Sequence, residues 1–154
     1  ALLFLSLISG RNAEYLIGKH VDSVPLLKKT NLEVIPTGYI LIENGKETAV
    51  ERVTETQPMV KAHKQKIADT ALAGELLGMK LMYLEAGSGA KHPIPLEIIS
   101  EVKRELGIPI IVGGGIRSTQ LLNDAYNSGA DLVVIGTAFE DNESFLDELE
   151  MPIK

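Results

Sequence analysis

The feature that most constrains the fold is a regular alternation of short apolar runs with longer amphipathic stretches. The apolar runs are rich in Leu, Ile and Val and show little polar alternation. Such runs are expected for strands that are covered on both faces. We therefore predict five strands, at Leu2–Leu7, Glu33–Ile42, Lys80–Glu85, Pro109–Gly113 and Asp131–Gly136.

The stretches between these runs carry apolar residues at helical spacing, with boundary residues typical of helices. Pro95 precedes one stretch and Gly107 follows it, an arrangement common at helix ends. Ser118 is a candidate N-cap for another stretch, and Gly129 marks its end. The predicted helices are Ala13–Lys29, Ile67–Leu77, Leu96–Leu106 and Thr119–Asn127.

This order of elements predicts an α/β fold with a parallel sheet and right-handed crossovers. The sheet could be an open doubly wound sheet or a (β/α)8 TIM barrel. Several successive strands end in polar or glycine-rich motifs, which favours a barrel with its site at one rim over a sheet with one switch point. We expect residues 1–154 to form a single, partial TIM-barrel domain, because five strands leave about three N-terminal βα units of the barrel missing.

Composition narrows the function classes. Aromatic residues make up only 5% of the 154 residues, so the core must be built from aliphatic side chains. A net charge of −6 disfavours a nucleic-acid partner, although backbone N–H groups can still bind a phosphate monoester locally. The absence of cysteine excludes disulfides and thiolate chemistry and fits a cytoplasmic protein. The apolar run at the start is too short to span a membrane.

Two successive predicted strands end in glycine-rich segments. Gly113-Gly114-Gly115 lies between a strand and a helix, and Gly136-Thr137 ends the next strand. Glycine lets the backbone approach a ligand closely, and the loops after strands seven and eight of TIM barrels commonly bind phosphate. We predict that the two segments close on one phosphoryl group. Taken alone, the glycine triplet could also be only a flexible turn.

A third segment, Tyr83–Ala90, ends the strand before the glycine triplet. Its glycines expose the backbone, and Ser88 offers a hydroxyl group. Glu85, at the strand end, is the best candidate for a general base or a hydroxyl-binding group; the alternative is a carboxylate fixed by a neighbouring lysine or arginine. Tyr83 could bind a ligand or pack inside the barrel. The segment lacks the spacing of a dinucleotide fingerprint or a P-loop.

The connection Glu43–Val60 is longer than the usual βα loop of about 2–6 residues. It contains Asn44-Gly45 and several charges, without a clear apolar period. One interpretation is a loop that folds over a substrate at the rim. The other is a solvated, hairpin-like excursion around the Asn-Gly turn.

Taken together, the motifs resemble those of the geranylgeranylglyceryl phosphate synthase family. They run through nearly the whole chain in the expected order. The segments that carry the resemblance are Ser6–Asn12 (SLISGRN), Pro36–Ile40 (PTGYI), Tyr83–Ala90 (YLEAGSGA), Pro109–Ser118 (PIIVGGGIRS) and Ala130–Thr137 (ADLVVIGT).

The resemblance implies a TIM barrel, of which this chain matches strands four to eight, and a prenyltransferase of ether-lipid and phospholipid biosynthesis. Members of the family join C1 of a polyprenyl diphosphate to the C3 hydroxyl of sn-glycerol 1-phosphate and release diphosphate, with Mg²⁺. Glu85 would be catalytic, orienting that hydroxyl and accepting its proton. The implied substrate contacts are Tyr83, Leu84, Glu85, Ala86, Gly87, Ser88, Gly89, Gly114, Gly115, Gly136 and Thr137.

The family's Mg²⁺ ligands lie on the first two strands of the barrel, so we expect them in the missing N-terminal part and name no metal residue in this sequence. Thr137 stands where many relatives have Asn, and it still offers a hydroxyl and a backbone N–H. The resemblance also suggests a homo-oligomer. Two alternatives stay open: another phosphate-binding barrel enzyme, acting on a sugar or indole phosphate, and a non-catalytic phosphate-binding fragment.

Overall fold

The computed structural model describes residues 1–146. The end of the predicted 1–154 domain, residues 147–154, lies outside the described residues. The strands form one five-stranded parallel sheet in the order β1-β2-β3-β4-β5. Their bounds are β1 Leu2–Leu7, β2 Val34–Leu41, β3 Leu81–Glu85, β4 Ile110–Gly113 and β5 Leu132–Val134.

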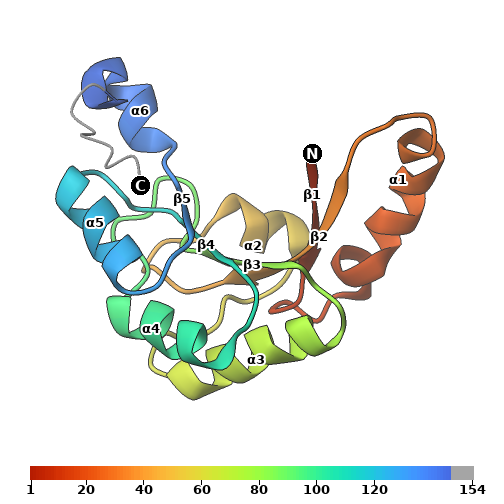
Figure 1. The fold of residues 1–154 in the computed structure, drawn as a ribbon, viewed down its shortest axis with the longest axis horizontal. Coiled ribbons are helices and arrows are strands. Elements are labelled where there is room, and N and C mark those ends of the chain that lie inside the picture. The colour runs from red at the N-terminus through yellow and green to blue at the C-terminus, as the bar shows by residue number, and fades with distance from the viewer. Residues whose placement is uncertain (147–154) are drawn as a thin grey trace.

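Helices occupy the connections between the strands and follow the last one. Their bounds are a π-helical turn at Glu14–Gly18, α1 Lys19–Leu27, α2 Ala49–Thr54, α3 Lys64–Leu76, α4 Leu96–Glu105, α5 Thr119–Asn127, α6 Thr137–Asp141 and a 3₁₀ turn at Glu143–Leu146. Helices α3, α4 and α5 lie side by side along one flank of the sheet (Figure 1). All five predicted strands and the cores of the four predicted helices are thus confirmed.

The strand order shows which kind of α/β sheet this is. Each strand pairs with the next one in sequence, so the described residues contain no reversal of winding. A doubly wound sheet needs such a reversal, and that alternative is therefore wrong for residues 1–146. Because right-handed crossovers that advance in one direction leave their helices on the same side, the sheet has one helix-covered face and one open face.

The register of the paired strands shows which side chains lie on each face of the sheet. Ile40, Leu84 and Val112 are fully buried against the helices and belong to the main hydrophobic core. Side chains one position away point to the opposite face, since successive side chains of a strand alternate. On that face Tyr39 and Tyr83 occupy one cross-strand row, with Glu85 in the next row toward the carboxyl ends. The candidate site is therefore built on the open face of the sheet.

The connection Glu43–Val60 is partly helical, although its sequence shows no clear apolar period. It contains α2, whose N-terminus is fixed by a capping box: the Thr48 hydroxyl accepts from the Glu51 N–H, and the Glu51 carboxylate accepts from the Thr48 N–H. The connection then returns to β2 through a parallel bridge between Ile42 and Met59. The hairpin-like excursion is thus wrong. A helix of six residues is too short to show an apolar period.

Two other boundaries shift. The predicted helix Ala13–Lys29 is divided into the π-helical turn and α1. The last strand is shorter than predicted, and β5 has a partner only on its β4 side among the described residues. In residues 1–146 we find no helix whose length and apolar character would suffice to cross a membrane.

Candidate functional site

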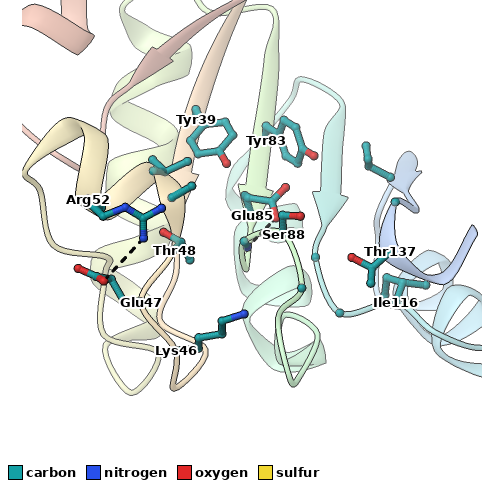
Figure 2. Close-up of a pocket in the computed structure, with 18 of the residues that line it drawn as sticks. Tyr39, Lys46, Glu47, Thr48, Arg52, Tyr83, Glu85, Ser88, Ile116 and Thr137 are labelled. Atoms are coloured by element: carbon teal, nitrogen blue, oxygen red, sulfur yellow. Dashed lines mark hydrogen bonds and ion pairs between the residues drawn. The ribbon is translucent and has the colours of Figure 1, made fainter. Parts of the chain in front are cut away.

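The carboxyl ends of β2, β3, β4 and β5 surround a hollow of about 540 Å³. We call it the rim pocket (Figure 2). Its walls come from the β2–α2 connection, the turn after β3, the glycine triplet after β4 and the end of β5. Parallel neighbouring strands bring these four segments to one edge of the sheet, although they are far apart in sequence.

The rim pocket gathers most of the predicted site. The predicted residues that line it are Tyr83, Glu85, Gly87, Ser88, Gly89, Gly114, Gly115, Gly136 and Thr137. Both glycine-rich strand ends border this one pocket, the first through Gly114 and Gly115 and the second through Gly136 and Thr137. Leu84 and Ala86 are not among the lining residues: their side chains are 0% and 1% exposed and pack in the hydrophobic core.

Glu85 lies in the rim pocket with its carboxylate largely shielded from water. The residue is only 7% exposed because it ends the central strand of the sheet, between Leu41 and Gly113. Its Oε1 accepts a hydrogen bond of 2.6 Å from the Gly87 N–H, and Tyr83 forms a second, side-chain hydrogen bond to it. No described lysine or arginine forms an ion pair with Glu85. The alternative of a carboxylate fixed by a cation is therefore wrong for residues 1–146.

The electrostatics of this cluster favour a proton acceptor flanked by neutral donors. Burial raises the pKa of Glu85, and its hydrogen bonds from Tyr83 and Gly87 oppose that shift. Burial also raises the pKa of Tyr83 and Tyr39, and the nearby Glu85 carboxylate raises both further. Both phenols therefore keep their protons at neutral pH. Their rings make an edge-to-face contact at 5.2 Å between centroids, so Tyr83 both packs and faces the pocket.

The glycine triplet is required by packing as well as by any ligand. A Cβ on Gly113 would lie 2.6 Å from Glu85 Oε2, and one on Gly114 would lie 2.7 Å from Glu85 Oε1. A Cβ on Gly115 would lie 2.6 Å from the backbone carbon of His92, and Gly115 has a φ of +74°. The triplet is thus more than a flexible turn, because only glycine lets this loop pass so close to the Glu85 carboxylate and the β3–α4 connection.

Packing does not require glycine at position 136. Its φ is −112°, and a Cβ built there meets nothing within 4 Å. It nevertheless lines the rim pocket beside Thr137. The protein's own packing does not demand glycine at this position, whereas a ligand that lies directly on the backbone would.

Sequence reasoning offered the Glu43–Val60 connection as a loop over the rim, but it named no site residue there or on β2. Tyr39, Lys46, Thr48 and Arg52 all line the rim pocket. Arg52 forms a loose, exposed ion pair of 3.9 Å with Glu47, whereas Lys46 points toward the turn after β3 (Figure 2). The Thr-x-x-Glu capping signature at Thr48 was a usable sequence signal for α2. The position of Tyr39 required the strand register.

Arg117, which follows the glycine triplet, also lines the rim pocket. It makes an exposed ion pair of 3.6 Å with Asp141 of α6. Ser118, the predicted N-cap of α5, does cap it by accepting from the Leu121 N–H. One donor of that helix end is therefore already used within the protein.

Comparison with known proteins agrees with this geometry. The model of the PcrB family matches residues 1–152. The chain belongs to the PcrB family. Two of its relatives are geranylgeranylglyceryl phosphate synthases from Flavobacterium johnsoniae, 61% identical over 96% of this chain, and from Pyrococcus furiosus, 46% identical over 91%. The family that the motifs indicated is thus confirmed.

Solved structures of this family have the same fold. The (S)-3-O-geranylgeranylglyceryl phosphate synthase of Thermoplasma acidophilum, solved in complex with sn-glycerol-1-phosphate, superposes on 96% of this chain with a TM-score of 0.89 at 32% identity. The enzyme from Thermoplasma volcanium superposes with a TM-score of 0.87. This PcrB-family chain spans 60% of the Flavobacterium relative, 55% of the Pyrococcus relative and 59% of each Thermoplasma chain.

Proposed function

We propose that the protein containing this chain is a prenyltransferase that joins a polyprenyl diphosphate to the C3 hydroxyl of sn-glycerol 1-phosphate. The observation that carries the proposal is the contact between the Glu85 carboxylate and the glycine triplet in one pocket. A candidate base thus lies directly beside a candidate phosphate-binding turn. That arrangement fits a small substrate with a phosphate at one end and a reacting hydroxyl at the other.

The chemistry assigned to these residues is a substitution at an allylic carbon. The C3 oxygen of glycerol phosphate forms a bond to C1 of the prenyl chain, while the bond between C1 and the diphosphate oxygen breaks and its electron pair leaves with diphosphate. The hydroxyl proton passes to Glu85, whose raised pKa makes it a better acceptor than an exposed carboxylate. Tyr83 and the Gly87 N–H hold that carboxylate in place.

We propose that backbone groups of Gly114, Gly115, Gly136 and Thr137 hold the phosphate of the glycerol substrate, with Ser88 offering a further hydroxyl. Fixing the phosphate there sets the distance from the C3 hydroxyl to Glu85 and so supplies the attack geometry. The open position of Gly136 supports this role. The name of the Thermoplasma acidophilum complex, which includes sn-glycerol-1-phosphate, supports the choice of substrate.

We further propose that the sheet belongs to a TIM barrel. The uniform winding supports closure, and so does the open face, on which Leu3, Leu5, Leu132 and Val134 are 37–48% exposed. In a barrel these apolar side chains would lie in the interior. Closure would also protect the outer edges of β1 and β5 from amide hydrogen exchange in the full-length protein, and fast exchange along both edges would argue against it.

Mg²⁺ dependence and homo-oligomer formation stay predictions. Within residues 1–146 no three His, Cys, Asp or Glu side chains come close enough together to hold a metal ion. The described residues therefore do not fit a protein-held Mg²⁺ site, and we derive no step through the ion.

The decisive experiment incubates the full-length protein with sn-glycerol 1-phosphate, Mg²⁺ and prenyl diphosphates of several lengths. The expected result is a prenyl ether of glycerol phosphate, identified by mass, together with released diphosphate. Binding of a sugar or indole phosphate in preference to glycerol phosphate would favour the other barrel enzymes instead. Phosphate binding without turnover would favour a non-catalytic role.

The substitution Glu85→Gln tests the assigned base. It keeps the shape of the side chain and removes its ability to accept the proton, so turnover should fall by about 10²–10⁴-fold. Binding of glycerol phosphate, measured by calorimetry, should change little because the phosphate contacts are untouched. Unchanged turnover would remove Glu85 from the mechanism.

A further inference from the structure

The β2–α2 connection packs against the turn after β3 at three points. The Asn44 side-chain Nδ2 donates a hydrogen bond to the Ala86 carbonyl oxygen. The Thr48 methyl lies so close to Gly87 that it would clash with a Cβ there. The Lys46 ammonium group reaches over Gly89, 3.6 Å from the position of a Cβ there. This connection therefore shapes the turn that borders Glu85.

One of these contacts acts on the peptide group that binds Glu85. The Ala86 carbonyl and the Gly87 N–H belong to the same peptide group, which is trans and planar. Its oxygen accepts from Asn44, and its N–H donates to Glu85 Oε1 at 2.6 Å. Fixing the oxygen thus fixes the direction of the N–H, because the two point to opposite sides of one rigid plane.

The peptide needs such a tether because its neighbour is glycine. Gly87 has a φ of +98°, a conformation that glycine adopts as readily as several others. Rotation of the Ala86–Gly87 peptide would turn its N–H away from the carboxylate without a steric penalty from a side chain. Asn44 opposes that rotation from the far side of the peptide.

We propose that Asn44 is a positioning residue that holds the Ala86–Gly87 peptide so that its N–H binds the Glu85 carboxylate. In its effect on turnover, this inference rests on the proposed function. Asn44 acts through the peptide and does not line the rim pocket.

The state of the Asn44 side chain supports this role. The residue is 6% exposed, and its Oδ1 has no hydrogen-bond partner among the described residues. A buried acceptor without a partner is unfavourable, so an apolar side chain of similar size would suit the packing better. The donor half of the amide is therefore what this position uses, and its acceptor is Ala86.

A matched control exists in Asn12. Its Nδ2 donates to the Thr54 carbonyl oxygen at 2.9 Å, and this bond joins the segment after β1 to the last residue of α2. Among the described residues its side chain has no hydrogen bond to the turn after β3, and its Oδ1 accepts from the Glu14 N–H. Comparing Asn44→Leu with Asn12→Leu thus separates the loss of an amide tether in general from the loss of this one.

The first test measures the titration of Glu85 itself. Infrared difference spectroscopy follows its carboxyl band in the full-length protein, with Glu85→Gln assigning the band. In Asn44→Leu the loss of the oriented N–H, which favours the ionised carboxylate, should raise the pKa of Glu85 above its wild-type value. In Asn12→Leu the band should titrate as in the wild type. Among the described residues the other titratable side chains facing Glu85 are Tyr39 of β2 and Tyr83 of β3, and both variants leave them unchanged.

The second test measures prenyl transfer. Asn44→Leu should lower kcat about tenfold or more, with the KM for prenyl diphosphate within about twofold of wild type, and should move the acid limb of the pH profile upward. Asn12→Leu should leave kcat and the acid limb in place. If Asn44→Leu does not fold, Asn44→Ser, which is too short to reach the Ala86 oxygen, takes its place.

The two tests separate the possible failures. An unchanged Glu85 titration in a folded Asn44 variant would overturn the positioning role. A wild-type protein without prenyl transfer, but with the expected shift in titration, would overturn the proposed function and leave the positioning role standing.

Discussion

Replacing Gly115 with alanine tests whether packing holds the glycine triplet in its observed conformation. A left-handed backbone, as at φ +74°, costs a residue with a Cβ about 1–2 kcal/mol. The new methyl group would also lie 2.6–2.7 Å from the backbone of His92 and Pro93, and such overpacking costs about 1–3 kcal/mol. Gly115→Ala should therefore lower the free energy of unfolding by about 2–5 kcal/mol.

Gly136→Ala is the matched control, since it makes the same chemical change where nothing lies within 4 Å and φ is −112°. Its effect on stability should stay within about 0.5 kcal/mol. Thermal or urea unfolding of the full-length variants measures both effects, and a loss of the size expected for Gly115→Ala lowers Tm by on the order of 10 °C. Equal stability of the two variants would refute the packing argument.

The same pair of variants separates packing from ligand binding. If Gly136 is glycine because phosphate lies against its backbone, its methyl group should weaken binding of sn-glycerol 1-phosphate by about tenfold or more, despite normal stability. Calorimetry measures this affinity directly. Wild-type affinity in Gly136→Ala would remove Gly136 from the proposed phosphate site.

Three further predictions concern single interactions. Tyr83→Phe removes a hydrogen bond that opposes the effect of burial on the pKa of Glu85, and the pKa of Glu85 should therefore rise. Because the proposed base must be ionised, activity is lost as pH falls through this pKa. The acid limb of the kcat/KM profile should therefore move to higher pH in Tyr83→Phe. At Asp131, burial raises the pKa, but hydrogen bonds from Lys103 and the Ile110 N–H outweigh it and leave the pKa below its ordinary value. The Asp131 carboxylate therefore stabilises the folded protein above its unfolded pKa of about 4, and this stabilisation is lost as pH falls through its folded pKa. Asp131→Asn should cost about 1 kcal/mol at neutral pH, after allowing for solvent exposure, and flatten the acid dependence seen in urea unfolding. Thr48→Ala breaks the capping box of α2 and should cost about 1 kcal/mol locally; hydrogen exchange should speed up in α2 and not in α5, a pattern that Ser118→Ala should reverse.

Local sequence determined the elements of this fold because each strand and each long helix carries its own pattern. The run Leu2–Leu7 was predicted with the bounds it has in the structure, and so was the helix Thr119–Asn127 between its cap and its glycine stop. α2 escaped prediction because six residues are too few for an apolar period, although Thr48 and Glu51 carry its capping signature. The same local patterns placed both glycine-rich segments at strand ends.

Tertiary structure decided what surrounds those segments. The β2 register places Tyr39 beside Tyr83, and the β2–α2 connection brings Asn44 against Ala86, more than forty positions away. Neither contact has a signature in the chain, because each depends on which strands are neighbours and on how far each loop extends. The burial of Glu85, and with it the raised pKa, has the same origin: a glutamate becomes a shielded proton acceptor only when other strands flank its own.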